Sequence, residues 1–146
     1  MQITHSGDFK VARSQEDVFD FLSDPEKFAP LLPDFKSVEK SGDACIVKIG
    51  VGISHIRGTA TIKLKLTESE RPTRATYAGT GSMAGGSVNI DAGFDLAESE
   101  GKTQVNWTGE AQVFGRIASL ARGLLQPLAK KNIQTVIDSL QTALES

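Results

Sequence analysis

Residues 105–113 read VNWTGEAQV, and residues 117–144 after them carry an apolar stripe with a different period. In the first stretch, apolar or small residues alternate with polar ones, which is typical of a half-buried antiparallel strand. In the second, apolar residues recur at steps of three and four, so about seven turns of helix present one apolar side at 3.6 residues per turn. A helix of this length needs a long apolar partner surface, and the strands upstream are the only candidate.

Composition indicates one domain over residues 1–146. The chain has 16 Lys and Arg against 18 Asp and Glu, and one cysteine, Cys45. The near-neutral balance gives no reason to expect nucleic acid as a partner. One cysteine excludes an internal disulfide and fits a reducing compartment, and the N-terminus lacks a signal-peptide pattern. We therefore expect a cytoplasmic protein whose contact with a membrane is peripheral, at the inner face.

Upstream of residue 105 the pattern predicts a strand over residues 3–11, then two short helices, then strands. The first helix begins at the capping box of residues 14–17, and the second at Asp24-Pro25. From residue 35 onward the period is two almost throughout. Short connections between strands imply an antiparallel meander. The prediction is an α+β fold in which a curved antiparallel sheet of about seven strands wraps around one long C-terminal helix.

Pro127 lies inside the helical stripe. A proline there removes a backbone donor and costs about 3 kcal/mol unless the helix bends. We expect a kink or a break, which would make residues 117–126 a semi-independent piece. Four basic residues nearby form either a docking patch for a membrane or partner, or a solvated helix face: Arg116, Arg122, Lys130 and Lys131.

Several short stretches, taken in order, carry a family resemblance. They are LPD at 32–34 with VE at 38–39, KIGVG at 48–52, RGTA at 57–60, ESERP at 68–72, GTG at 79–81 and VFGRIASLA at 113–121. Together they resemble the CoxG family of carbon monoxide dehydrogenase accessory proteins. The order of elements resembles the helix-grip fold of the START and birch-pollen-allergen (SRPBCC) superfamily, to which that family belongs.

The resemblance implies a function. The family is implicated in assembling the dehydrogenase or tethering it to the membrane and respiratory chain, and the fold implies an apolar pocket for a quinone or a lipid. We expect no cofactor, and as partners the apolar molecule, an oxidoreductase complex and the membrane surface, but no nucleic acid. The alternative is an enzyme of the polyketide cyclase or aromatase type, which an inward acid–base pair would favour. A third hypothesis is an adaptor with a filled core.

Small residues at inward-facing positions have two interpretations. They either border an opening or admit the helix close to the sheet, and the residues alone leave both open. The fold resemblance favours the opening. We expect no catalytic or metal-binding residues, and a ligand-binding set formed by Phe21, Phe28, Leu32, Val51, Ile62, Tyr77, Gly79, Ile90, Phe94, Trp107, Gly109, Ala121, Leu124, Leu125 and Leu128.

The polar groups on inward faces are few. His5 shares the apolar face of the first strand and either binds a ligand carbonyl or is a satisfied core residue, which we favour; His55 lies on a polar face. Tyr77 and Trp107 each have one polar atom, which a core must satisfy and a pocket can turn toward a ligand oxygen. The histidines have no partners at metal-site spacing. Residues 79–86 indicate a flexible hairpin turn rather than a phosphate loop.

Overall fold

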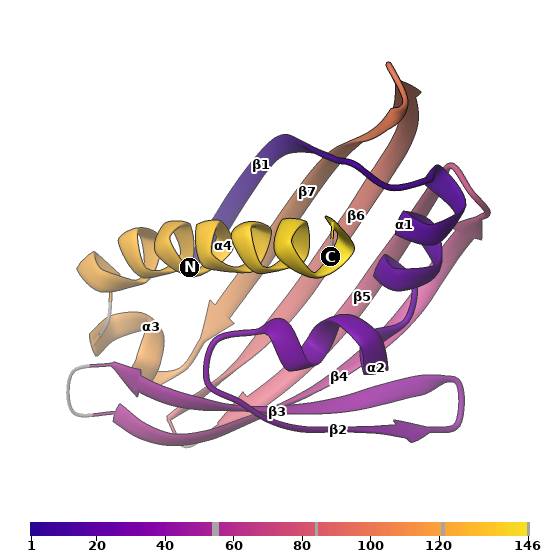
Figure 1. Ribbon diagram of the computed structural model, residues 1–146. Coiled ribbons are helices and arrows are strands. Elements are labelled where there is room, and N and C mark those ends of the chain that lie inside the picture. Colours follow the sequence, from indigo (N-terminus) through magenta and orange to yellow (C-terminus); the bar gives the residue numbers. More distant parts are fainter. Residues whose placement is uncertain (54–55, 84, 121, 146) are drawn as a thin grey trace.

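The computed structural model, which describes residues 1–53, 56–83, 85–120 and 122–145, contains one sheet with helices on one of its faces (Figure 1). His55 and Ala121, named above, lie outside the described residues. The sheet has seven strands, which confirms the α+β helix-grip prediction. The strands are β1 (Gln2–Val11), β2 (Phe35–Ser41), β3 (Ala44–Ile53), β4 (Ile56–Glu70), β5 (Arg74–Met83), β6 (Gly86–Ser99) and β7 (Lys102–Phe114).

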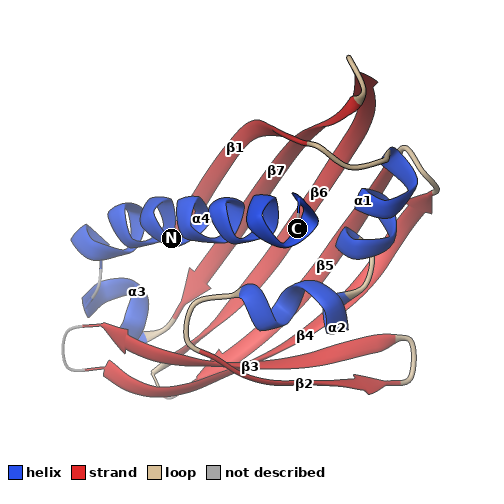
Figure 2. Cartoon of the chain, viewed as in Figure 1, coloured by secondary structure: helices blue, strands red, loops and turns tan. Residues whose placement is uncertain are grey.

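The strands are antiparallel in the order β1-β7-β6-β5-β4-β3-β2, so β1 and β2 form the two edges. The connection between the edges crosses the inner face, by which we mean the face that the helices cover (Figure 2). It carries three short helices: α1 (Gln15–Leu22), α2 (Pro25–Phe28) and the 3₁₀ helix η1 (Ala29–Leu31). Two further helices follow β7, namely α3 (Arg116–Leu120) and α4 (Arg122–Glu145).

The predicted helix starts are confirmed. The Ser14 side chain accepts a hydrogen bond from the backbone N–H of Asp17, which satisfies one of the free donors in the first turn of α1. Asp24 does the same for Glu26 at the start of α2, where proline occupies the first helical position. These caps explain why two short helices form between β1 and β2.

We expected a kink or a break at Pro127. Helix α4 continues through this residue, so the break is wrong. Pro127 is the sixth residue of α4, and its ring is exposed to solvent. Its missing N–H would have bonded the carbonyl of Gly123, so one hydrogen bond is lost in the second turn of the helix. The proline therefore removes a bond near the end of the helix without dividing it.

The predicted turn over residues 79–86 is also shorter than expected. β5 continues to Met83 and β6 begins at Gly86, so Gly79 and Gly81 belong to a strand. The side chain of Leu64 occupies the space in front of Gly79, and that of Val88 the space in front of Gly81. The two glycines make room for neighbouring side chains, which sequence alone does not distinguish from turn glycines.

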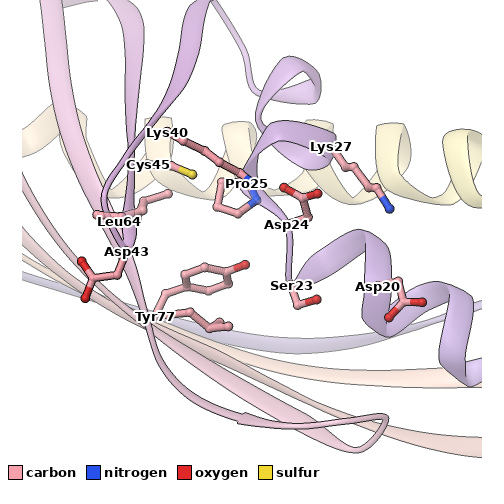
Figure 3. A pocket seen from close by; sticks show the side chains of 12 residues that line it. Asp20, Ser23, Asp24, Pro25, Lys27, Lys40, Asp43, Cys45, Leu64 and Tyr77 are labelled. Carbon is pink, nitrogen blue, oxygen red and sulfur yellow. The ribbon is translucent and has the colours of Figure 1, made fainter.

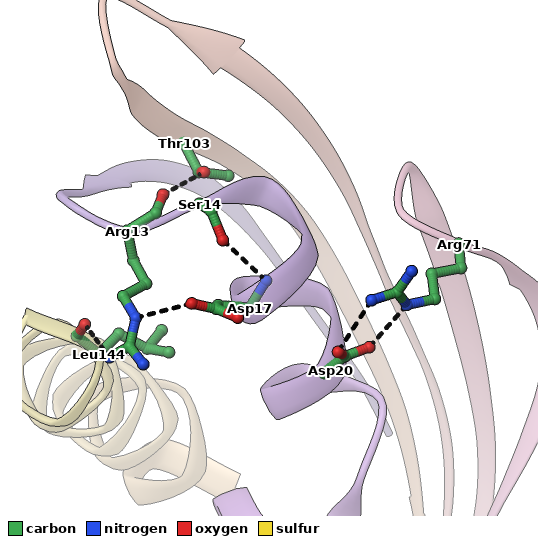
Figure 4. A network of polar contacts seen from close by, with 7 residues as sticks. All are labelled: Arg13, Ser14, Asp17, Asp20, Arg71, Thr103 and Leu144. Carbon is green, nitrogen blue, oxygen red and sulfur yellow. Dashed lines mark hydrogen bonds and ion pairs between the residues drawn. The ribbon is translucent and has the colours of Figure 1, made fainter.

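Polar bonds hold the C-terminal end of α4 (Figure 4). The Arg13 guanidinium donates to the carbonyl of Leu144 at 3.1 Å and to the Asp17 carboxylate at 3.0 Å. The Arg13 carbonyl accepts from the Thr103 hydroxyl at 2.7 Å. Gln141 donates to the carbonyl of Lys10 at 3.0 Å. The last turns of α4 are thereby joined to β1, α1 and β7.

Candidate ligand-binding interior

The buried apolar side chains between the sheet and the helices form two clusters. The first lies under α1 and the C-terminal half of α4, and the second under α3 and the N-terminal half of α4. The first cluster contains Val11, Val18, Phe19, Leu22, Ala75, Tyr77, Phe94, Leu96, Val105, Leu140 and Leu144. The second contains Ile3, Val113, Ile117 and Leu125.

A row of four residues crosses the inner face from Tyr77 in the first cluster to the edge strand β1. Tyr77 of β5 is opposite Ala92 of β6, Ala92 is opposite Gly109 of β7, and Gly109 is opposite His5 of β1. We call these four residues the central row. Its two middle members, Ala92 and Gly109, have almost no side chain, so little side-chain volume projects from the sheet there. Larger residues stand in the adjacent rows: Phe94 and Trp107 on one side, and Ile90 on the other.

Two glycines show where the interior is filled and where it is open. A Cβ atom on Gly79 would lie 2.9 Å from Leu64 Cδ2 and 3.5 Å from the Cβ of Ile90, so this position is packed. A Cβ atom on Gly109 would have no neighbour within 4 Å among the described residues. Of the two interpretations of small inward residues, close packing therefore applies at Gly79, and open space applies at Gly109.

Two pairs of polar side chains are important on the inner face. In the first, the Tyr77 hydroxyl donates to the carbonyl of Leu22 at 2.8 Å, and Thr103 bonds the backbone of Arg13. Burial, and then the nearby Asp24 carboxylate, raise the pKa of Tyr77 above its ordinary value, so the hydroxyl stays protonated and donates. This bond fastens the end of α1 to β5.

The second pair is His5 and Trp107. Their Nε2 and Nε1 atoms are buried and have no hydrogen-bond partner among the described residues. His5 lies on the same face of β1 as the buried residues Ile3 and Val11, and Trp107 lies on the same face of β7 as the buried Val105. Both side chains therefore face the interior.

A hollow of about 440 Å³ opens beside the central row, between the α1–α2 connection and strands β3 to β5 (Figure 3). Its inner wall contains Cys45, Leu64, Leu66 and Tyr77. Burial raises the pKa of the Cys45 thiol, which stays a small protonated group there. The rim is charged, with Asp20, Asp24, Lys27, Lys40 and Asp43. The hollow joins solvent to apolar residues of the inner face.

A second hollow, of about 330 Å³, lies on the opposite face of the sheet. It is lined by outward-facing threonines and carboxylates together with the backbone side of the central row. Its polar members are Thr4, Thr67, Thr76, Asp91, Thr108 and Glu110. This lining does not suit an apolar molecule, so we place the candidate site on the inner face.

The structure distributes the expected ligand-binding residues over the interior. Those in or against the first cluster are Phe21, Phe28, Tyr77, Phe94 and Trp107. Those in or against the second cluster are Val51, Leu125 and Leu128. Half-buried residues on or beside the inner face are Leu32, Ile62, Ile90 and Gly109, and Gly79 is buried by its neighbours. Leu124 lies at the surface, 50% exposed, rather than in the interior.

Sequence reasoning left three residues out of the expected set that the structure places at the site. His5 ends the central row, Ala92 forms its floor, and Leu66 lies beside Tyr77 in the wall of the hollow. Strand alternation places each of them inward. Their proximity follows only from the register of five strands, which no local pattern in the sequence provides.

At one end of the molecule, β7 passes into α3 and α4 begins (Figure 1). Two large apolar side chains are exposed in this region. Phe114 is 46% exposed and Leu124 is 50% exposed, and these are the largest exposures of big apolar side chains in the described part of the chain. Arg116 and Arg122 beside them are also exposed.

None of the described helices is long and apolar enough to cross a membrane. In the described ranges, no cluster of three or more His, Cys, Asp or Glu side chains forms a metal site.

Comparison with known proteins identifies the family and the fold. The sequence model of the carbon monoxide dehydrogenase CoxG family matches residues 7–145. No curated protein matches the chain. Among solved structures, a conserved protein from Geobacillus kaustophilus matches with a TM-score of 0.86 and 24% identity, covering 97% of this chain and 95% of that chain.

Two more distant structures share the fold. The Zhui aromatase/cyclase from Streptomyces sp. R1128 matches with a TM-score of 0.71 and 15% identity, covering 99% of this chain and 94% of that chain. A START superfamily protein from Mycobacterium smegmatis matches with a TM-score of 0.69 and 12% identity, covering 97% and 96% of the two chains. At these identities the similarity establishes the fold alone.

Proposed function

The chain belongs to the CoxG family of carbon monoxide dehydrogenase proteins, and we propose that it binds a hydrophobic small molecule, a quinone or a lipid, between the sheet and α4. The observation that carries this proposal is the open space in front of Gly109, between two packed clusters. Natural cores are packed almost without voids, so unfilled space on an inner face calls for an occupant.

The chemistry of the walls supports an apolar occupant. The rows beside Gly109 contribute apolar side chains such as Ile90 and Phe94. Ligand pockets of this kind combine apolar walls with a few polar groups that fix orientation. Each buried CH₂ of a ligand chain gains about 0.8 kcal/mol, so a chain of moderate length binds usefully even after ordering costs are subtracted.

The polar groups of the inner face also provide evidence on the enzymatic alternative. A cyclase or aromatase on this fold would need an acid–base pair close to the substrate. On the described strands, His5 faces the interior without a carboxylate beside it, and the carboxylates Asp20, Asp24 and Asp43 stand on the rim of the hollow. This arrangement favours binding without chemistry.

Native mass spectrometry tests the proposal directly. Protein purified without detergent is expected to carry an apolar molecule that is lost after extraction with organic solvent. The extracted protein should then bind a fluorescent fatty acid or a quinone with micromolar or tighter affinity. A bare protein mass, combined with no binding of either probe, would contradict the proposal.

We further propose that the ligand passes between a membrane and an oxidoreductase of the carbon monoxide dehydrogenase type. The exposed Phe114 and Leu124 side chains lie close to Arg116 and Arg122 in the chain, a combination that suits peripheral contact with an anionic lipid surface.

Cosedimentation with vesicles tests the membrane contact. Wild type is expected to sediment with phosphatidylcholine–phosphatidylglycerol vesicles, and the double variant Phe114→Ser, Leu124→Ser should remain in the supernatant. Vesicles of phosphatidylcholine alone provide the control for the arginine contribution. Equal sedimentation of wild type and double variant would show that Phe114 and Leu124 do not mediate membrane contact.

A further inference from the structure

We infer that His5 and Trp107 form a polar anchor that binds a neutral hydrogen-bond-accepting oxygen of the apolar ligand. The inference rests on the proposed function, because it concerns the molecule that occupies the space in front of Gly109. It specifies the class of ligand: an apolar body with a ketone, quinone or ester carbonyl.

The two donors lie close together. A Cβ atom on Gly7 would lie 2.9 Å from Cζ2 and 3.2 Å from Nε1 of Trp107, so the indole leans from β7 onto the backbone of β1. Gly7 and His5 are two residues apart on the same face of β1, and such positions are roughly 7 Å apart along a strand. A single small molecule can therefore reach the indole N–H and the imidazole.

The donors also adjoin the open space. His5 is directly opposite Gly109 in the β1–β7 ladder, and Trp107 is two residues from Gly109 on the same face of β7. The unfilled position and the two unpartnered nitrogens thus occupy one corner of the inner face. Leaving a buried N–H without a partner costs about 1–3 kcal/mol, and folded proteins seldom do so.

The chemistry of the two side chains determines what they bind. An indole N–H donates and never accepts, so the ligand atom that meets Trp107 must be an acceptor. His5 donates from Nε2 when the proton is on that nitrogen. The described residues of β1, β5, β6 and β7 place no Lys or Arg on this face, and an unpaired carboxylate is expensive to bury. A neutral oxygen therefore fits better than a charged one.

Other groups of the interior do not compete for this role. The Tyr77 hydroxyl and the Thr103 hydroxyl already donate to backbone carbonyls. Thr103→Val is consequently a matched control, since it removes a hydroxyl from the same interior without removing a free donor, and Thr103 belongs neither to the central row nor to the wall of the hollow. Trp107→Phe and His5→Leu remove the two free donors and keep apolar bulk.

Two pairs of probes differ only in oxygen and represent the two sources of such a carbonyl. The quinone pair is tetramethyl-1,4-benzoquinone and tetramethylbenzene, and the ester pair is methyl decanoate and undecane. Binding is measured by equilibrium dialysis for wild type and for the three variants. Wild type is expected to prefer the oxygen-bearing member of one pair roughly five- to tenfold, the net value of a hydrogen bond.

The variants identify the donors. Trp107→Phe and His5→Leu should each reduce the preference for the oxygen-bearing probe severalfold and leave the affinity for its oxygen-free partner unchanged. Thr103→Val should retain the preference. Whichever pair shows the effect reports whether a quinone or an ester is recognised. Decanoate should bind more weakly than methyl decanoate, and tighter binding of decanoate would overturn the neutral-oxygen assignment.

Failure of the anchor and failure of the proposed function give different results. If the oxygen-free probes bind and the oxygen-bearing probes bind no tighter, the anchor is overturned while the proposed function stands. The anchor is also overturned if the variants weaken both members of a pair equally, because the side chains are then walls alone. If no probe binds to wild type, both ideas fall.

Discussion

The two ends of α4 are held very differently. At the C-terminal end, Leu140 and Leu144 are buried in the first cluster, and Arg13 and Gln141 add hydrogen bonds to the backbone. At the N-terminal end, α4 contributes one buried residue, Leu125, to the second cluster, Leu124 is exposed, and Pro127 lacks an N–H. Among the described residues, the first turns of α4 show no side-chain bond to the sheet.

This contrast indicates how one fold combines stability with an open interior. Local unfolding free energies vary across a protein, and segments with few buried contacts open first. The firmly held end keeps the helix on the sheet, while the lightly held end can move to admit a ligand. We therefore expect the C-terminal end of α4 to determine global stability and the N-terminal end to determine ligand exchange.

The largest expected effect is at the firmly held end. Leu144→Ala should lower the free energy of unfolding by about 2–5 kcal/mol, because it removes a side chain that is only 3% exposed. The control Leu124→Ala should change it by less than about 0.5 kcal/mol, since that side chain is 50% exposed. Urea unfolding measures both, and similar losses in the two variants would erase the proposed difference between the ends.

A smaller effect is expected from the polar bonds. Arg13→Met removes the guanidinium that donates to the Leu144 carbonyl and keeps the apolar stem, so it should reduce stability by about 1 kcal/mol. Arg122→Met at the other end is the matched control, because Arg122 shows no polar partner among the described residues. Its unfolding midpoint should remain at the wild-type value. If Arg122→Met shifted the midpoint as much as Arg13→Met, the stability loss could not be attributed to the hydrogen bond between Arg13 and the Leu144 carbonyl.

A third effect, smaller than that of Arg13→Met, concerns Pro127. Pro127→Ala restores an N–H that can bond the Gly123 carbonyl, and should raise the free energy of unfolding by about 0.5–1 kcal/mol. Hydrogen exchange should slow in residues 122–128 and stay constant in residues 138–145. Ligand dissociation should slow as well if this end opens for exchange. If hydrogen exchange slows but the ligand dissociation rate is unchanged, opening of the N-terminal end of α4 does not control ligand exchange.

Much of the fold could be predicted from local pattern. The alternation in residues 105–113 and the stripe after Ile117 predicted the last strand and the long helix, and the caps at Ser14 and Asp24 predicted the two short ones. These features depend on residues close in sequence. Propensity, capping and periodicity act at that range, which is why the prediction succeeded.

The interior could not be predicted to the same depth. Gly79 and Gly109 look alike in sequence, as small residues on inward strand faces. Leu64 nevertheless fills the space at Gly79, whereas no described side chain fills the space at Gly109. The difference depends on which side chains the neighbouring strands bring opposite each glycine. Likewise, the position of the Trp107 indole against Gly7 follows from the pairing of β1 with β7, two strands about a hundred residues apart.

The most direct test of the central claim, that the interior holds space for an apolar ligand, is to fill that space. Gly109→Leu and the matched variant Gly79→Leu are compared by urea unfolding and by titration with a fluorescent fatty acid and a quinone. We predict that Gly79→Leu overpacks against Leu64 and loses about 1–3 kcal/mol, whereas Gly109→Leu changes stability by less than about 0.5 kcal/mol and loses ligand binding. Equal destabilisation of both variants, with ligand binding by Gly109→Leu unchanged, would contradict the account.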